Sequence, residues 1–133
     1  MTRFVVDSTA VLHLAKARIE VPKRHELLAP TLLRSQTLSA LHEAVHRGEM
    51  DAAEARDLLP RVGPPGMKIR LLGDAVLRRV AWELADRLGW PSTYDAEYLA
   101  LTRLQADAFV TIDRELARRA EGVVQLASLD DLR

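Results

Sequence analysis

Phe4–Asp7 (FVVD) and Ala108–Asp113 (AFVTID) are two short apolar runs near opposite ends of the chain, and each one ends on an aspartate. Both are rich in β-branched and aromatic residues, which is typical of strands buried on two faces in a parallel sheet. Ligands of open parallel sheets bind outside the carboxyl ends of the strands. We therefore expect Asp7 and Asp113 to meet in one acidic site. Neighbouring carboxylates repel each other unless a positive group separates them, and a hard divalent cation is the usual one.

The composition is that of one soluble globular domain. The chain has 133 residues, 48% hydrophobic and 29% charged, which is enough apolar material for its own core. It contains no cysteine, which excludes disulfides, thiol nucleophiles and thiolate zinc sites. No apolar run approaches the roughly 20 residues of a membrane span. We therefore expect a cytoplasmic protein with no membrane partner.

The charge balance bears on nucleic-acid binding. Basic and acidic residues number 19 each, so the net charge is zero, which argues against a general nucleic-acid coat. A local basic rim would still guide the phosphates of an RNA substrate. Arginine, which suits phosphates and carboxylates, dominates the basic residues, although a genome that favours arginine codons explains this equally well. The only lysines are Lys16, Lys23 and Lys68.

Helix and strand signals alternate along the chain, which predicts parallel βα units and an α/β fold. The fold class we expect is a three-layer helix–sheet–helix sandwich with a central, mostly parallel sheet. The periodicity predicts helices over 8–17, 31–47, 51–59, 74–88, 92–104 and 114–120. The remaining apolar runs predict strands at 4–6, 25–30, 68–72, 108–112 and 123–126.

Two of these helices have apolar stripes that we expect to be buried. In the helix over 31–47 the stripe consists of Leu32, Leu33, Leu38, Leu41, Ala44 and Val45. In the helix over 74–88 it consists of Val76, Leu77, Val80, Ala81, Leu84 and Leu88. We expect Trp82 and Trp90 to contribute core and helix-end packing.

Each candidate aspartate also has a purely structural explanation. Asp7 and Asp113 lie between a strand and a helix, where an aspartate often caps the first free amides. Asp95 lies three residues after Ser92, which matches a loose capping box. Glu97 lies about 200° around the helix from Asp95, so we expect a surface charge there.

Four segments resemble PIN-domain proteins, and VapC-type toxins of bacterial toxin–antitoxin pairs in particular. They are Thr2–Ser8, Ala29–Leu33, Tyr94–Ala96 and Val110–Asp113, in the order and spacing of that family. The resemblance covers essentially the whole chain, so it implies one PIN-like domain over residues 1–133. It also implies an endoribonuclease that depends on Mg²⁺ or Mn²⁺ and uses Asp7, Asp95 and Asp113 as catalytic residues and metal ligands. Ser8 and Thr111 fall where small hydroxyl residues support the site.

One position departs from the family pattern. The helix after Ala29-Pro30 normally carries a glutamate on its inward face, and by spacing that position is Gln36. An amide oxygen ligates a hard cation more weakly than a carboxylate does. Glu43 lies on nearly the same helix face but about 10 Å along the axis, where it would hold a second ion, hold a water or remain a solvated charge.

Residues His42–His46 match H-E-x-x-H, the zinc-binding pattern of metallopeptidases. A zinc peptidase would need a further ligand downstream, where only carboxylates remain, so we set this reading aside. A phosphoryl-transfer protein is also disfavoured, because Asp7-Ser8-Thr9 lacks a second aspartate. Tyr94 and Tyr98 flank Asp95, where packing is favoured over stacking on a base.

Two functions follow from these residues. The first is a metal-dependent ribonuclease that acts as a toxin, with Arg34 and Arg114 as candidate phosphate contacts. The second is a PIN-like module that binds RNA or a protein partner with weak or no catalysis, because Gln36 replaces the acidic residue. Under both, the resemblance implies a small antitoxin as partner and a homodimer. The helical hairpin over 31–59, with Leu58 and Leu59, is the candidate docking surface.

Overall fold

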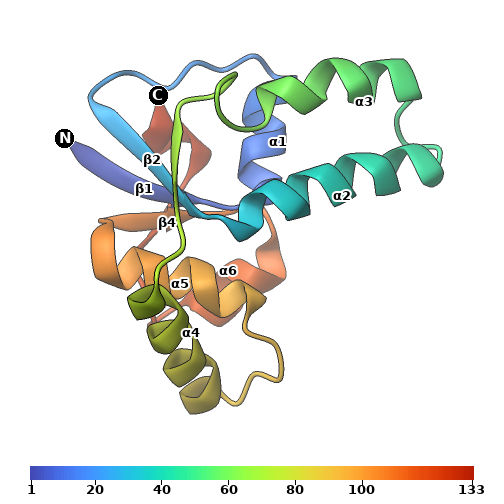
Figure 1. Cartoon of the computed structure of the whole chain (residues 1–133). Helices are drawn as coiled ribbons and strands as arrows, with labels where there is room; N and C mark the ends of the chain where they lie inside the picture. Colours follow the sequence, from blue (N-terminus) through green and yellow to red (C-terminus); the bar gives the residue numbers. More distant parts are fainter.

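The computed structural model describes residues 1–133 and has a five-stranded sheet between two layers of helices (Figure 1). The strands are β1 (Thr2–Val6), β2 (His25–Pro30), β3 (Ile69–Leu72), β4 (Ala108–Val110) and β5 (Leu126–Ala127). Their order is β3-β2-β1-β4-β5, and every neighbouring pair is parallel. The predicted helix–sheet–helix sandwich is confirmed. The structure has a PIN-like topology in which the carboxyl ends of all strands meet at one edge.

The helices are α1 (Ser8–Lys16), α2 (Leu32–His46), α3 (Ala52–Leu58), α4 (Ala75–Leu88), α5 (Tyr94–Gln105) and α6 (Arg114–Ala120). Two short 3-10 helices, η1 (Leu59–Arg61) and η2 (Leu129–Leu132), complete the chain. Four helices begin after an aspartate whose side chain accepts a backbone N–H of the first turn: Asp7, Asp51, Asp74 and Asp113. Helix α4 ends at Gly89 in the left-handed region, with φ of 72°.

Strand residues alternate between the two helical layers, as the pleat of a strand requires. Phe4 and Val6 of β1 pack in the core beneath α1, α2 and α3, whereas Val5 packs in the core beneath α4, α5 and α6. Figure 1 shows these two sets of helices on opposite faces of the sheet. Both faces of the sheet are therefore buried, which explains why its strands are continuous apolar runs.

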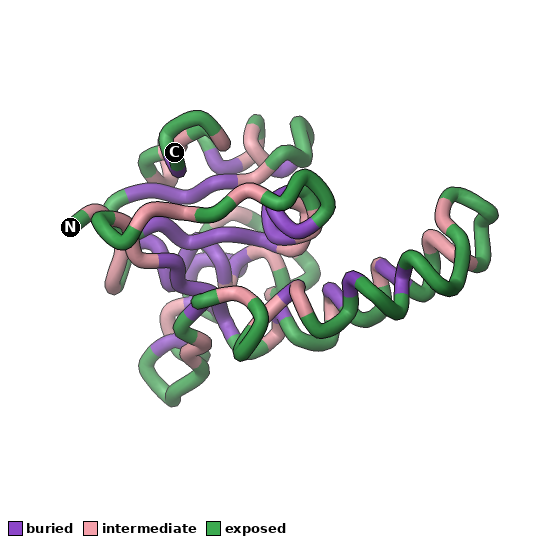
Figure 2. Tube along the Cα trace, turned by 90° about the horizontal axis from the view of Figure 1, so that it is seen from above, coloured by how far each residue is buried: buried purple, intermediate pink, exposed green.

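The pair α2–α3 projects from the body of the protein, and Figure 2 shows it exposed along most of its length. Leu33 and Leu41 of α2 are buried, as predicted, but Leu38 is 54% exposed. The prediction for Leu38 is wrong because α2 packs on α1, α3, η1 and the end of β2, which cover only a narrow face of the helix. Leu58 is also buried, whereas Leu59 is 42% exposed.

Helix α4 likewise buries a narrower face than its sequence pattern predicts. Leu77, Ala81 and Leu84 face the core, whereas Val76 is 47% and Trp82 is 70% exposed. The predicted burial of these last two residues is wrong, because α4 lies on the outside of the sandwich and packs mainly on α5. Trp90 follows α4, is partly buried, and packs against the core beneath α4, α5 and α6, as predicted.

Two strand predictions also need correction. The last strand is Leu126–Ala127 instead of 123–126, because the amides of Val123 and Val124 bond the carbonyl of Ala120 at the end of α6. Strand β4 ends at Val110, and the amide of Ile112 bonds a threonine side chain instead of a neighbouring strand. No helix combines the length and apolar content that crossing a membrane requires.

Candidate active site

Asp7 lies at the carboxyl edge of the sheet, directly after the central strand β1, and is 5% exposed. Its amide bonds the carbonyl of Val110 at the end of the neighbouring strand β4. Its carboxylate also accepts the amide of Ala10 at 3.0 Å, so Asp7 is the N-cap of α1. The predicted cap is confirmed, and it fixes the side chain at the place where ligands of parallel sheets bind.

Two threonines complete the surroundings of Asp7. Thr9 donates its hydroxyl to Oδ1 at 2.6 Å, and Thr111 donates its hydroxyl to Oδ2 at 2.5 Å. With the Ala10 amide, Oδ1 accepts two hydrogen bonds and Oδ2 accepts one. A carboxylate offers about four acceptor positions, so Oδ2 has room for one more partner. The predicted support from Thr111 takes the form of this direct hydrogen bond.

Burial raises the pKa of the Asp7 carboxyl, because it removes water from the charged form. The hydrogen bonds from Thr111, Thr9 and the Ala10 amide oppose this effect, in that order, and the negative charge of Asp113 adds to it. The negative charge of Asp113 therefore acts on Asp7, as is expected of two aspartates that follow neighbouring parallel strands.

Asp113 begins α6, and its Oδ1 accepts the amides of Glu115 at 3.0 Å and Leu116 at 3.1 Å. Its Oδ2 has no hydrogen-bond partner, and the residue is exposed. The amide of Asp113 donates to the hydroxyl of Thr111 at 3.1 Å. Thr111 thus connects Asp113 to Asp7 through one side-chain oxygen.

Thr9 was not predicted as a site residue, yet its side chain connects the start of α1 to the segment that follows β4. Its hydroxyl accepts the amide of Ile112 at 3.1 Å and lies 3.3 Å from the hydroxyl of Thr111. The sequence signal that would have identified it is a hydroxyl residue two positions after a strand-ending aspartate, where it reaches back to the carboxylate.

Asp95 lies in the first turn of α5, and its Oδ2 accepts Nη2 of Arg119 from α6 at 2.9 Å. The capping-box interpretation of Asp95 is wrong, because Ser92 instead accepts the amide of Tyr94 and Thr93 makes no side-chain cap. The guanidinium of Arg119 lies 4.8 Å from the centre of the Trp90 ring. The ring and the carboxylate together hold Arg119 in place.

Gln36 of α2 contacts Tyr98 of α5. The Tyr98 hydroxyl donates to Oε1 of Gln36 at 2.6 Å. Tyr98 is buried, and its burial raises the pKa of the phenol, helped by the charges of Asp7, Glu97 and Asp95. The hydroxyl therefore stays protonated and donates to Gln36. The expectation that Tyr98 packs in the core is confirmed, while Tyr94 is 59% exposed.

Burial also raises the pKa of Glu97, against a nearby positive charge of Arg78. Glu97 was expected to be a surface charge. Its side chain is instead partly buried between α4 and α5.

The site predicted from the sequence is only partly assembled in this structure. No three His, Asp or Glu side chains anywhere in the chain come close enough together to hold a metal ion. Asp7 and Asp113 are connected through the hydroxyl of Thr111, whereas Asp95 is bound by Arg119. The H-E-x-x-H histidines, His42 and His46, are exposed on α2 and belong to no such group.

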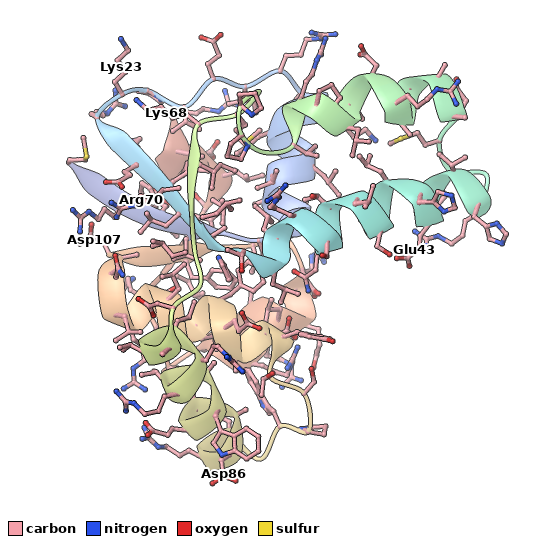
Figure 3. The ribbon with its side chains drawn as sticks, in the orientation of Figure 1. Lys23, Glu43, Lys68, Arg70, Asp86 and Asp107 are labelled. Carbon is pink, nitrogen blue, oxygen red and sulfur yellow. The ribbon has the colours of Figure 1, made fainter.

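The remaining candidates lie around this edge or beyond it. Ser8 opens α1, is partly buried and makes no side-chain hydrogen bond. Glu43 is exposed toward the far end of α2 (Figure 3), where it accepts the Ser39 hydroxyl at 2.7 Å and pairs with Arg47 at 3.7 Å. Arg34 and Arg114 are exposed near the starts of α2 and α6, and neither forms an ion pair.

Comparison with solved structures supports the fold. The chain is similar to PAE2754 from Pyrobaculum aerophilum, with 25% identity, a TM-score of 0.75, and coverage of 98% of this chain and 92% of that one. It is also similar to VapBC-1 from nontypeable Haemophilus influenzae, with 12% identity, a TM-score of 0.61, and coverage of 97% and 99%. No protein-family model and no curated protein matches the chain. The three-layer sandwich is therefore PIN-like, and the likeness rests on structure.

Proposed function

We propose that this protein is a metal-dependent endoribonuclease and the toxin of a toxin–antitoxin pair. The observation that carries the proposal is the buried carboxylate of Asp7 at the carboxyl edge of the sheet, held by Thr9 and Thr111 and adjacent to Asp113. A buried carboxylate with a raised pKa beside a second carboxylate is typical of a functional site. The structural likeness to VapBC-1 supports the same class of protein.

The chemistry of the carboxylate oxygens that remain free to accept fits Mg²⁺ or Mn²⁺. One acceptor position on Oδ2 of Asp7, Oδ2 of Asp113 and Oδ1 of Asp95 are free of hydrogen bonds. All are carboxylate oxygens, the ligands that hard cations prefer. Asp7 and Asp113 would hold the ion, and Asp95 would join them on leaving Arg119.

When bound, a divalent cation would supply positive charge to the phosphate and an activated water for in-line attack. The chain itself contributes the positioning. Thr9 and Thr111 fix the rotamer of Asp7, and the cap interactions fix Asp113. Arg34 and Arg114, which are exposed and form no ion pair, are the residues we propose as phosphate contacts.

Two observations favour the second candidate function, which is a PIN-like module that binds RNA or a partner without efficient cutting. Gln36 brings a neutral amide where a carboxylate would add charge, and its oxygen already accepts the Tyr98 hydroxyl. Asp95 is neutralised by Arg119. Both features reduce the attraction of the edge for a cation.

We further propose that the partner is a small antitoxin that binds the projecting α2–α3 pair. Leu38 of α2 and Leu59 of the adjoining η1 are exposed, at 54% and 42%, and offer apolar contacts to a helix or an extended segment. Leu58, which the sequence placed in the same surface, is buried in the core beneath α1 and does not take part. A homodimer and a cytoplasmic location complete the proposal.

The test is cleavage of a labelled RNA mixture by the purified chain with Mg²⁺, Mn²⁺ or EDTA. We expect cutting that requires metal and is lost in both Asp7→Asn and Asp95→Asn. Asp86→Asn, an exposed aspartate on α4, is the matched control and retains activity. Cutting that persists in the Asp7 and Asp95 variants would show that the site is wrongly assigned. A folded chain that cuts no RNA under any condition would favour the binding module.

A further inference from the structure

A cavity of about 690 Å³ opens at the edge of the sheet opposite to Asp7. It lies where strands β1, β2 and β3 begin, between the end of α1 and the segment before β3. Its volume is in the range of pockets that bind small molecules, roughly 300–1,000 Å³. Figure 3 shows Lys23, Lys68 and Arg70, which line this cavity, at the end of the molecule where the strands begin.

The lining of this cavity is rich in cations that lack acidic partners. Arg18, Lys23 and Lys68 line it, and none of the three forms an ion pair. Two further arginines of the lining are paired: Arg61 lies 3.6 Å from Asp57, and Arg70 lies 3.2 Å from Glu26. The lining also contains two carboxylates, Glu20 and Glu26, and Glu26 already faces both Arg3 and Arg70. The unpaired charge is therefore positive, which favours an anionic ligand.

The rest of the cavity wall is apolar. Leu14 and Leu27 are buried in the wall, and Ile19, Val21 and Met67 are partly buried beside them. A free inorganic anion gains nothing from these side chains, whereas the apolar part of an organic ligand would bury surface against them.

His25 also contributes to the wall of the cavity. Its ring packs edge-on against Phe4, with centroids 5.1 Å apart, and its Nδ1 is buried without a hydrogen-bond partner. It is the one buried side-chain nitrogen or oxygen in the chain without a partner. Because this atom is fully buried it does not face the open cavity, and the ligand contacts proposed below do not include it.

Arg18 has an unusual backbone conformation at the mouth of the cavity. It follows α1 with φ of 54°, and the amides of Arg18 and Ile19 bond the carbonyls of Ala15 and Leu14 at 3.3 and 3.0 Å. This is a Schellman motif, in which glycine usually occupies the left-handed position. Arginine accepts a steric penalty there that glycine avoids.

We propose that this cavity binds a small organic phosphate with an apolar or aromatic portion, the chemical class of a mononucleotide. Arg18, Lys23 and Lys68 bind the phosphate, and the apolar portion lies against Leu14, Ile19 and Met67. The proposal is independent of the nuclease proposal, because the cavity lies at the opposite edge of the sheet and shares no residue with the acidic site.

The test is isothermal titration calorimetry of the full chain with AMP, UMP and hexyl phosphate, against adenosine and inorganic phosphate alone. EDTA is present throughout, so that the acidic edge has no metal to attract phosphates. We expect at least one of the three organic phosphates to bind with one-to-one stoichiometry, at least tenfold tighter than adenosine or inorganic phosphate. Preference for AMP or UMP identifies a nucleotide site, whereas preference for hexyl phosphate identifies an alkyl phosphate site, and either supports the proposal.

The variant Arg18→Gly with Lys68→Gln removes two of the cations, and we expect it to weaken binding at least tenfold. Lys16→Gln is the matched control, since Lys16 is exposed on α1 outside the cavity, and its affinity stays within twofold of the original. Arg18→Gly alone keeps or raises the melting temperature, because glycine suits the left-handed position, so lost binding is not lost folding. The proposal is overturned if no organic phosphate binds, if inorganic phosphate binds equally well, or if the double variant and the control behave alike.

Discussion

The buried carboxylate of Asp7 makes stability depend on pH in a direction opposite to that of most aspartates. Its pKa in the folded protein lies above the ordinary value of 3.8, with burial as the largest cause. The folded state therefore holds the proton more tightly than the unfolded state, and ionisation of Asp7 destabilises the fold. This penalty is fully present above the folded pKa and disappears as the pH falls through that pKa toward 3.8.

We therefore expect Asp7→Asn to raise the free energy of unfolding at neutral pH, by about 0.5–2 kcal/mol, the usual gain from relieving a strained functional position. Asparagine keeps an acceptor for Thr9 and the Ala10 amide but carries no charge. Urea unfolding at several pH values measures the difference, which should shrink as the solution is acidified. Asp86→Asn, on the surface, should change stability little at any pH. Equal or lower stability of Asp7→Asn at neutral pH would contradict this account.

We propose that Gln36 limits how strongly the carboxyl edge of the sheet attracts a cation. Gln36→Glu keeps an acceptor for the Tyr98 hydroxyl and adds a negative charge beside this phenol, whose pKa the charges of Asp7 and Asp95 already raise. We expect RNA cleavage at limiting Mg²⁺ to rise about tenfold, while stability without metal falls because the carboxylates repel each other. Gln125→Glu, an exposed change after α6, should alter neither property. Unchanged cleavage in Gln36→Glu would mean that this position does not influence the metal.

Among single residues, the sequence predicts those whose role follows from local position. Asp7 directly follows strand β1, Asp113 follows strand β4 after Thr111 and Ile112, and both cap the next helix, so each signal is local in the chain. Thr111 was predicted to support the site through the resemblance to PIN-domain proteins. Arg119 and Tyr98 were missed because their partners, Asp95 and Gln36, come from other helices. Only the packing of α2, α5 and α6 brings these pairs together.

At the scale of elements, periodicity locates helices well but overestimates how wide a face each helix buries. Helix α2 carries leucines at 33, 38 and 41, and only Leu33 and Leu41 face the core. The pattern alone does not reveal that α2 and α3 project from the body, because that depends on how few elements cover them. The final strand was misplaced for a similar reason, since the turn after α6 uses the amides of Val123 and Val124.

The difference between Leu41 and Leu38 is measurable. Leu41→Ala should lower the free energy of unfolding by about 2–5 kcal/mol, because it leaves a cavity between α2 and its neighbours. Leu38→Ala, on the exposed side of the same helix, should change it by less than about 0.5 kcal/mol. Urea denaturation of the two variants makes the comparison. Similar losses in both would show that α2 is covered on both sides in solution, for example by a second copy of the chain.

At the scale of the whole molecule, the parallel sheet separates two surfaces of opposite character. Its carboxyl edge carries Asp7 and Asp113, and the cavity at its amino edge is lined by the unpaired cations Arg18, Lys23 and Lys68. The sequence predicts the first surface, because strands that end on aspartates are visible in it. It does not predict the second, because Arg18, Lys23 and Lys68 come from separate segments that only the fold brings together.

The central claim is that Asp7, Asp95 and Asp113 together bind a divalent cation, although Arg119 holds Asp95 in the present structure. The most direct test is titration of the full chain with Mn²⁺, with free Mn²⁺ followed by electron paramagnetic resonance. We expect uptake at one or two sites, with affinity reduced about tenfold or more in each of Asp7→Asn, Asp95→Asn and Asp113→Asn. Asp86→Asn should bind like the original chain. Uptake that survives all three substitutions, or no uptake by the folded original chain, would contradict the claim.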